Sequence, residues 1–501
     1  MALKVGVDGK FLNAVNTHYD TYNRTTNGYE FYLYGTGKTE DEVNDDGTKY
    51  RADRVGTYTY SGGNAWRSYT PDAYNYTSAS NPDEWGAGNV SGERRNGRFL
   101  YAQGKLFVGA PLTDVGTTDR GAVTVIFPHR MKSGLSTDFQ DYDLPATVSN
   151  TYGKHWSLFT ASESESSMEF GWSLAFTRGQ LFVSAPFKND NYTNEGRIYR
   201  YTGDYTYGTP TETKYDAGTI GDNGGLDFSN FANNQEWGSS MSAANGVLCV
   251  GDDLGNAYIT HLARRERSED SYLPDWIKIV APLDEQGNAG SAQGFGFNVK
   301  VGCGRVIIVS RYYATATTTN AGAFHIYDYY GNHIRTVTNP DGASLNGQFA
   351  YSTEIGSGRI VCSGRAGFGY RDFFIFDLDG ELIKKVSAST FTPFYDDSGS
   401  LAVGFGRIAC VSGYADVPSN NNGEAALFDL DGNRIGMDLL PCTSKQSQTL
   451  GVGGLAIGPG RLYALASAHA SSGSVHASIQ EWPIHTSMTK WDVEAMEDGD
   501  V

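Results

Sequence analysis

Seven copies of one strand pattern predict an all-β fold for this 501-residue chain, a seven-bladed β-propeller of four-stranded antiparallel blades. In each copy, a turn at a glycine leads into a short apolar run. Composition agrees, because 62 glycines, 32 tyrosines and 15 prolines suit tight turns and strands. The third observation is that no long amphipathic helical pattern occurs along the chain.

The repeat is marked by its glycine turns, each followed by an apolar strand. They are Gly104-Lys105, Gly179-Gln180, Gly246-Val247, Gly304-Arg305, Gly358-Arg359, Gly406-Arg407 and Gly460-Arg461. The spacing runs from 48 residues (Gly358 to Gly406) to 75 residues (Gly104 to Gly179). The strand core therefore persists while the connecting loops vary in length, as in repeat folds.

One copy shows the four strands of a predicted blade. Gln348–Ser352 is the first strand, Ile360–Cys362 the second, and Phe373–Phe376 the third. Asp379-Gly380 then predicts a hairpin into the fourth strand, Glu381–Val386. Each blade is therefore an antiparallel meander, whose strands we name A to D from the axis outward.

Residues 1–95 lack the repeat and precede the predicted propeller at 96–501. Leu3–Leu12 could form a hairpin around Asp8-Gly9, and residues 29–35 and 55–62 predict short strands. The segment has many tyrosines and few aliphatic residues, too few for a core of its own. We expect an extended arm that lies over this propeller or over a neighbouring subunit.

The residue types of each strand match the predicted position of that strand in its blade. The A strands are rich in small residues, which suits backbones that converge on an axis. The B strands are almost wholly apolar, as expected of strands covered on both faces. The C strands end in acidic turns, Asp377/Asp379 and Asp429/Asp431, where Asp bonds to its own backbone. We favour this turn role over general acid–base catalysis for these carboxylates.

The seventh blade has a clear C strand from Ser474 but no clear D strand. Either Met488–Met496 supplies the missing strand, or the N-terminal segment Leu3–Phe11 does by pairing the two chain ends. Both alternatives stay open from the sequence.

Charge and segment patterns exclude several classes of partner. The formal charge of −18 argues against nucleic acid and against an anionic membrane surface. No stretch approaches the about 20 apolar residues that span a bilayer, and the first residues do not resemble a signal peptide. The five cysteines lack CxxC spacing, and Cys249, Cys362 and Cys410 fall in B strands. We expect structural thiols in a chain that is made in the cytoplasm.

Two resemblances add to this pattern. Phe170-Gly171 followed by Leu181–Pro186 resembles the FG-GAP repeat of integrin-type propellers, and Phe107–Pro111 repeats its second half. The calcium loop of that family is here reduced to Thr177–Gln180, so the resemblance implies no calcium. The composition as a whole also resembles a tailed-bacteriophage virion protein, a class in which tail and adsorption proteins carry propeller domains.

The candidate binding surface is the set of B–C loops, which leave every blade on one face. Aromatic and charged loop residues are typical of carbohydrate and protein binding. The candidates are Lys188, Tyr192, Arg311, Tyr312, Tyr313, Phe368, Tyr370, Arg371, Tyr414 and Asp416. We expect no catalytic residues, no metal site and no cofactor. Scattered histidines lack zinc spacing, and Glu42–Asp53, which has calcium-loop spacing, favours a solvated turn.

The leading hypothesis is a non-enzymatic virion structural protein of a tailed phage, whose propeller serves in assembly or adsorption. Its partners would be other virion subunits, further copies of itself in the particle, and a host-surface glycan or receptor. One alternative is an enzyme acting on polysaccharide, which predicts at least two carboxylates at the channel mouth. The other is a cell-surface adhesin or lectin-like protein.

Overall fold

The computed structural model describes most of the predicted propeller and short parts of the first 95 residues. The described residues are 4–5, 11–12, 19–25, 28–33, 67–69, 98–113, 116–126, 156–189, 192–203, 210–216, 232–262, 276–342, 348–364, 372–387, 401–412, 424–439, 448–468, 478–484 and 486–497.

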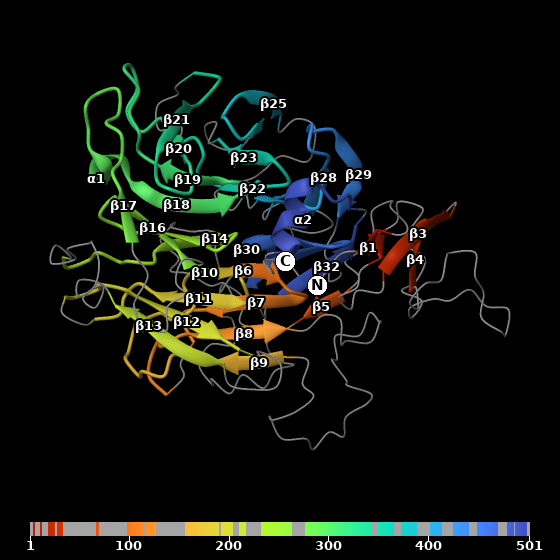
Figure 1. Ribbon diagram of the computed structural model, residues 1–501, viewed down its shortest axis with the longest axis horizontal. Helices are drawn as coiled ribbons and strands as arrows, with labels where there is room; N and C mark the ends of the chain where they lie inside the picture. Colours follow the sequence, from red (N-terminus) through yellow and green to blue (C-terminus); the bar gives the residue numbers. More distant parts are fainter. Residues whose placement is uncertain are drawn as a thin grey trace.

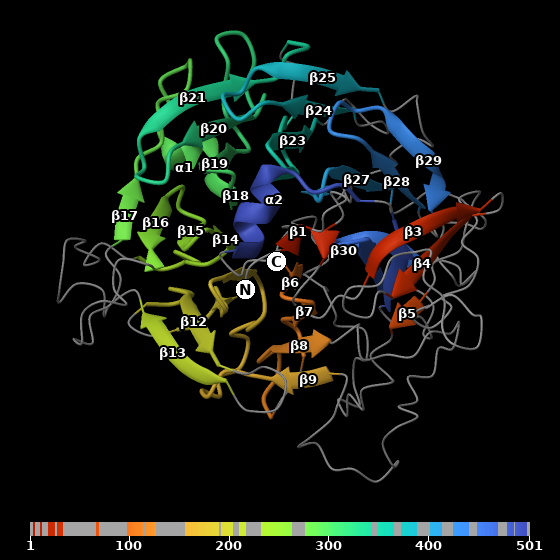
Figure 2. The ribbon, with the colours of Figure 1, turned by 45° about the vertical axis from the view of Figure 1, so that its right-hand side comes forward.

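Seven four-stranded antiparallel sheets form a ring around a central axis, which confirms the predicted seven-bladed propeller (Figures 1 and 2). Blade 1 contains β6 (Phe99–Ala102), β7 (Lys105–Ala110), β8 (Ala122–Ile126) and β9 (Trp156–Phe159). Blade 2 contains β10 (Leu174–Thr177), β11 (Gln180–Ala185), β12 (Arg197–Thr202) and β13 (Thr211–Asp216). Blade 3 contains β14 (Ser240–Ala244), β15 (Val247–Gly251), β16 (Ala257–His261) and β17 (Trp276–Ile279).

The remaining blades repeat this order. Blade 4 contains β18 (Phe295–Gly302), β19 (Arg305–Ser310), β20 (Ala323–Tyr327) and β21 (His333–Thr338), preceded by the short helix α1 (Gly290–Gln293). Blade 5 contains β22 (Thr353–Gly356), β23 (Arg359–Ser363), β24 (Phe373–Phe376) and β25 (Leu382–Val386). Blade 6 contains β26 (Leu401–Gly404), β27 (Arg407–Ser412), β28 (Glu424–Phe428) and β29 (Arg434–Leu439).

Blade 7 joins the two ends of the chain. It contains β30 (Gln448–Gly458), β31 (Arg461–Ala468), β32 (Ser478–Pro483) and, as its outer strand, β5 (Arg67–Tyr69). The pairs Ile479↔Tyr69 and Glu481↔Arg67 set the antiparallel register. The ring is therefore closed by a strand from within residues 1–95.

Both sequence-based candidates for this closing strand are wrong. Residues Lys490–Glu497 form helix α2 instead, because Thr489 caps its first turn: the backbone N–H of Thr489 donates to the Asp492 carboxylate at 2.7 Å. The N-terminal candidate instead pairs within itself, since β1 (Lys4–Val5) pairs with β2 (Phe11–Leu12), as the hairpin prediction expected. A second described hairpin joins β3 (Tyr19–Thr25) to β4 (Gly28–Leu33).

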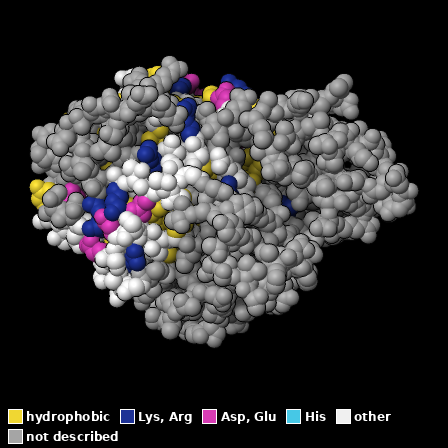
Figure 3. Space-filling model, turned by 60° about the horizontal axis from the view of Figure 1, so that its bottom comes forward, with side chains coloured by type: hydrophobic (Ala, Val, Ile, Leu, Met, Phe, Trp, Pro, Cys, Tyr) yellow, Lys and Arg dark blue, Asp and Glu magenta, His cyan; other side chains and the backbone are white. Residues whose placement is uncertain are grey.

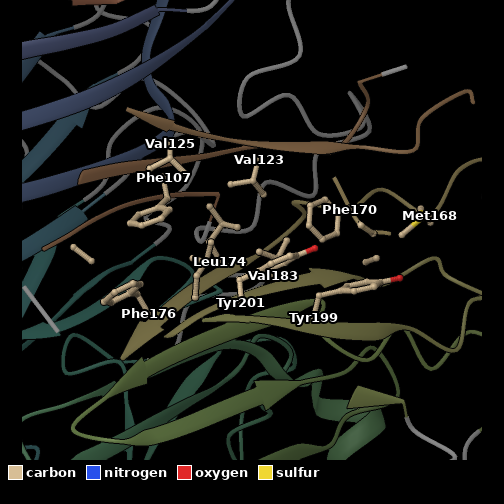
Figure 4. Close-up of a cluster of buried hydrophobic side chains, with 14 residues drawn as sticks. Phe107, Val123, Val125, Met168, Phe170, Leu174, Phe176, Val183, Tyr199 and Tyr201 are labelled. Atoms are coloured by element: carbon tan, nitrogen blue, oxygen red, sulfur yellow. The ribbon is translucent and has the colours of Figure 1, made fainter. Parts of the chain in front are cut away.

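The hydrophobic core lies between blades rather than within one of them. Figure 4 shows Phe107 and Val125 of blade 1 facing Leu174 and Phe176 of blade 2. The rings of Phe107 and Phe176 lie 5.5 Å apart between their centroids. Since each sheet is covered on both faces, its B strand is buried almost throughout, as the sequence predicted.

In blades 1 to 6, each A strand turns into its B strand through two residues with left-handed backbone, whereas the turn of blade 7 has Pro459 before Gly460. In blade 2 these are Arg178 (φ 51°) and Gly179 (φ 73°), and in blade 5 Ser357 (φ 48°) and Gly358 (φ 79°). Positive φ at both positions is the type I′ turn, whose twist matches that of the strands. This geometry explains the glycine of the repeat and confirms that the loop at Thr177–Gln180 is a tight turn.

The acidic C–D turns of blades 5 and 6 also have the predicted role. Asp377 accepts backbone N–H bonds from Asp379 at 3.0 Å and Glu381 at 2.8 Å. Asp429 does the same with Asp431 at 3.0 Å and Asn433 at 2.8 Å. We call the end of the ring that carries the A–B and C–D turns the turn face, and the opposite end the loop face.

Candidate functional site

The central channel is a cavity of about 230 Å³ lined by the A strands of all seven blades. Most of the residues that line it have apolar side chains, although polar atoms form the larger share of its exposed wall. Its lining residues are Phe99–Ala102, Leu174–Phe176, Met241–Ala243, Lys300, Val301, Glu354, Ile355, Leu401–Val403 and Gly454–Ile457. A cavity of this size holds a small molecule or several waters rather than a polymer chain.

Lys300 and Glu354 are the two charged residues among those lining residues, and they bind each other. The Lys300 Nζ lies 2.7 Å from Glu354 Oε1, across the seam between blades 4 and 5. Burial raises the pKa of Glu354, and the Lys300 ammonium offsets part of that rise. The channel therefore contains a compensated ion pair rather than a pair of free carboxylates.

The pair stands out because other blades have uncharged residues at the same level. Lys300 and Glu354 each lie four residues before the glycine of their A–B turn. The residues at that position in the other blades are Leu100, Ala175, Ser242, Ala402 and Ala456. Desolvation of two charges is costly, so the pair depends on its close geometry.

Side-chain oxygens of one A strand bind the backbone of the next. Ser173 Oγ accepts a bond from Met241 N at 3.0 Å, and Ser242 Oγ accepts one from Val301 N at 3.0 Å. Thr177 Oγ1 accepts from Gly246 N at 2.8 Å. These bonds satisfy N–H groups at strand edges that face the axis. They fix the inner strands of neighbouring blades to one another.

The predicted binding residues of blade 2 have different roles. Lys188 is buried, forms an ion pair with Glu165 and donates to the carbonyl of Asn189. The Lys188 ammonium is therefore already paired within the protein. Tyr192, in contrast, exposes 40 % of its surface, while its backbone N–H donates to Glu195 at 3.2 Å.

The predicted residues of blade 4 include an arginine packed among aromatic rings. The Arg311 guanidinium lies 4.9 Å from the ring centroid of Phe297 and 5.1 Å from those of Tyr312 and Tyr351. Phe297 and Tyr351 belong to blades 4 and 5, so Arg311 joins two blades by cation–π contact. Tyr312 remains exposed, whereas Tyr313 is buried.

The structure therefore brings Arg311 and Tyr312 together on one loop and places Lys188 and Tyr192 on another blade. Of the five candidates whose positions are described, Tyr192 and Tyr312 present large accessible aromatic surfaces. The Arg311 guanidinium packs against aromatic rings, and the Tyr313 side chain is buried. The other candidates, Phe368, Tyr370, Arg371, Tyr414 and Asp416, lie outside the described residues.

Sequence reasoning missed a related contact at the same end of the A strands. Arg98 lies 4.1 Å from the ring centroid of Trp172, and the Trp172 indole N–H donates to the carbonyl of Ser239 at 3.1 Å. Trp172, Phe297 and Tyr351 occupy the same place, seven residues before their turn glycine. Aligning the blades on those glycines would have found this set.

One acidic residue beside this set has an altered pKa. Burial raises the pKa of Glu169 to about 7, with Asp119 and Glu236 adding to the rise and Arg98 opposing it. Among the described residues, no group of three or more His, Cys, Asp or Glu side chains has the arrangement of a metal site. No described helix has the length and apolar character that crossing a bilayer requires.

Comparison with known proteins adds the following. The chain matches no family model and no curated protein sequence. Among solved structures, it is similar to the computationally designed protein Ika8, with 10 % identity and a TM-score of 0.39, covering 84 % of this chain and 100 % of that one. It is also similar to Raptor of Chaetomium thermophilum, with 13 % identity and a TM-score of 0.44, covering 79 % of this chain and 28 % of that one. At these scores neither similarity bears on function.

Proposed function

We propose that this chain is a non-enzymatic structural protein of a tailed-phage particle, in which the propeller serves as an assembly or adsorption module. The observation that supports the proposal is that neighbouring blades are joined to one another by side-chain contacts. Bonds between A strands and cation–π contacts between blades hold the ring together from inside. A module fastened in this way offers a rigid platform whose outer loops can bind partners.

The lining of the channel supports a binding role over a catalytic one. A polysaccharide-acting enzyme would need two carboxylates placed to act on a glycosidic bond. Among the described lining residues, the Glu354 carboxylate is paired with Lys300. The acidic turn residues Asp377 and Asp429 are likewise bound by backbone N–H groups.

The surface supports contacts with protein or glycan. Exposed tyrosines combine a large contact area with a hydroxyl, at a small entropic cost of ordering. Tyr192 and Tyr312 have this character on the loop face. On the face shown in Figure 3, Lys and Arg side chains lie beside Asp and Glu, so the described part of that face carries mixed charge. Mixed charge suits a specific protein contact better than a polyanion.

The N-terminal segment and the FG-GAP and phage-virion resemblances also support this proposal. Residues 1–95 supply β5 to blade 7, and the rest of this tyrosine-rich segment would lie over the propeller or contact a neighbouring copy or another virion subunit. The FG-GAP-like motifs at Phe170-Gly171 and Leu181–Pro186 support a propeller that binds rather than cleaves. The protein would be made in the host cytoplasm and would end in the virion, with a host-surface glycan or receptor as a further partner.

Mass spectrometry of purified particles tests the proposal. We expect peptides of this chain in gradient-purified particles at a constant ratio to the capsid protein. Their absence from particles, with the chain found on the cell surface, would contradict the proposal and support the adhesin alternative. Release of reducing ends from host-surface glycans by the purified protein would support the enzyme alternative.

A further inference from the structure

The last described segment of the chain, residues 486–497, crosses the turn face, and we call it the C-terminal strap. The backbone N–H of Gly460 in blade 7 donates to Thr486 Oγ1 at 3.1 Å. Ser487 N donates to the carbonyl of Phe405 in blade 6 at 2.9 Å. The strap then ends in helix α2, which Figure 2 shows near the middle of the ring.

One carboxylate anchors this strap. Asp492 accepts bonds from Ser357 Oγ of blade 5 at 2.8 Å and from Phe405 N of blade 6 at 2.9 Å. It also accepts a bond from Thr489 Oγ1 in its own helix cap at 2.6 Å. A single side chain therefore binds two blade turns and the start of the helix.

Beyond these bonds, Met488 packs against the core of blades 6 and 7 and Trp491 lies against Gly358, but neither side chain is fully buried. Within residues 486–495, the part of the strap whose side chains are described, Asp492 alone is buried. The Trp491 and Val493 side chains are half-buried. Since elements with few buried apolar contacts open at low free energy, the strap is the kind of segment that separates without global unfolding.

The strap covers the end of the channel at the turn face. Channel residues Val301, Ile355 and Val403 each stand three residues before the turn glycine of their blade, and α2 packs on two of those turns. Cys303, in the turn of blade 4, is buried, and its Sγ accepts a bond from Gly358 N at 3.4 Å. Burial raises the pKa of the Cys303 thiol to about 11, with the Asp492 and Glu494 carboxylates adding to the rise.

We propose that the C-terminal strap is a separable cover over the turn-face end of the channel, held closed by Asp492. Opening it would expose the turns of blades 4 to 6, including Cys303, while the blades stay folded. The donors left behind, Ser357 Oγ–H and Phe405 N–H, would form a receptor for a carboxylate. The inference concerns the ring itself and does not depend on a role in a virion.

Thiol labelling of the full-length protein tests this cover. In a Cys442→Ser background, Cys303 is the reporter and the B-strand thiols of Cys249, Cys362 and Cys410 report on unfolding, since all four are buried. We expect Asp492→Ala to raise the labelling rate of Cys303 at least about tenfold, which corresponds to about 1.4 kcal/mol of opening free energy. Peptide mapping should show the three B-strand thiols unmodified on that timescale.

Glu494→Ala is the matched control, because Glu494 is exposed on the same helix and also raises the pKa of Cys303. It measures the effect of removing a nearby charge without removing the anchor. A chain ending at Ser487 should reproduce the Asp492→Ala result. Equal rates for Asp492→Ala and Glu494→Ala would overturn the proposal. So would labelling of all four cysteines together, because the strap would then not separate from the ring.

Discussion

Arg305 of blade 4 binds Asp379 in the C–D turn of blade 5, with its Nη2 at 2.9 Å from Asp379 Oδ1. Its Nε donates to the Leu378 carbonyl of the same turn at 3.1 Å. Arg359 repeats the contact one blade later, with Leu430 O at 3.1 Å and Asp431 at 3.5 Å. In blades 4 and 5, the arginine of the Gly-Arg turn therefore fastens its blade to the next one at the outer part of the turn face.

We expect Arg305→Ala and Arg359→Ala each to lower the free energy of unfolding by about 1 kcal/mol, the usual net value of such bonds. Because the two arginines act at different seams, their effects should add. Asp379→Ala should cost less, since the bond to the Leu378 carbonyl remains. Urea denaturation checks these values, and a larger loss for Asp379→Ala than for Arg305→Ala would contradict the assignment.

The ion pair in the channel gives a second prediction. Lys300→Met would leave the Glu354 carboxylate without its partner, and breaking a buried pair costs about 3–5 kcal/mol. Burial already raises the pKa of Glu354, and loss of Lys300 raises it further. An acid whose folded pKa is raised loses stability as pH rises through its unfolded pKa toward the folded one. Lys300→Met should therefore be less stable at pH 8 than at pH 5.

The double variant Lys300→Met/Glu354→Leu is the control for this pair. It removes both charges, so its stability should lie closer to that of the parent chain and should lack the added pH dependence. A double-mutant cycle from thermal unfolding measures the coupling. Simple additivity of the two single changes would show that the charges do not interact.

Closure of the ring by β5 gives a third prediction. A chain lacking residues 1–60 keeps Arg67–Tyr69 and should retain the urea midpoint of the complete ring. Removing residues 1–75 takes away the partner of β32 and exposes the edge of blade 7. We expect that variant to unfold at lower urea and to aggregate more, because unpaired strand edges associate. Equal midpoints for the two truncations would mean that β5 does not close the ring.

Glu163 leads to a prediction about the stability of the protein at low pH. Burial alone would raise its pKa, but bonds from Lys214 and from Arg197, together with the Tyr199 hydroxyl, outweigh burial and lower the pKa to about 2. A lowered folded pKa gives stability that is present above the unfolded value and is lost as pH falls toward the folded one. At neutral pH, Glu163→Gln should cost about 1 kcal/mol, since solvent screens this half-exposed site.

The difference between Glu163→Gln and the parent chain should shrink as pH falls from about 5 toward 2, because the parent then also carries a neutral carboxyl. Glu381→Gln is the control, since its pair with Arg335 is exposed and contributes little at any pH. Thermal unfolding at several pH values measures both. A cost for Glu163→Gln that stayed constant with pH would exclude the charge as its cause.

The fold could be predicted because its signals are local. A glycine at φ 73° in the turn after Arg178 and an Asp such as Asp429 in a C–D turn are both set by residues a few positions apart. The closing strand could not be predicted in this way. Arg67-Ser68-Tyr69 has no apolar pattern of its own and is a strand only because β32 offers an unpaired edge.

Two features of the structure, the Lys300–Glu354 pair and helix α2, could have been predicted from the spacing of residues in the sequence. Lys300 and Glu354 lie at the same distance from their turn glycines, so aligning the blades would have placed them side by side. The Thr489 and Asp492 spacing is likewise that of a helix cap, and it predicts α2 rather than a strand. The burial of Lys188 could not be foreseen, because Glu165 reaches it from another loop.

The A–B turns are all two residues long, whereas the distance between successive turns varies from 48 to 75 residues (Gly358 to Gly406, Gly104 to Gly179). Variation in length is thus concentrated in the other connections of each blade. Because lengthening a surface loop by a few residues costs little free energy, the B–C and D–A connections of the loop face can acquire new sequences while the A–B turns stay constant. The molecule is in this sense a scaffold whose innermost turns are constant and whose loop face can change, and peptide insertions after β7 (Lys105–Ala110) are where a new specificity could be introduced.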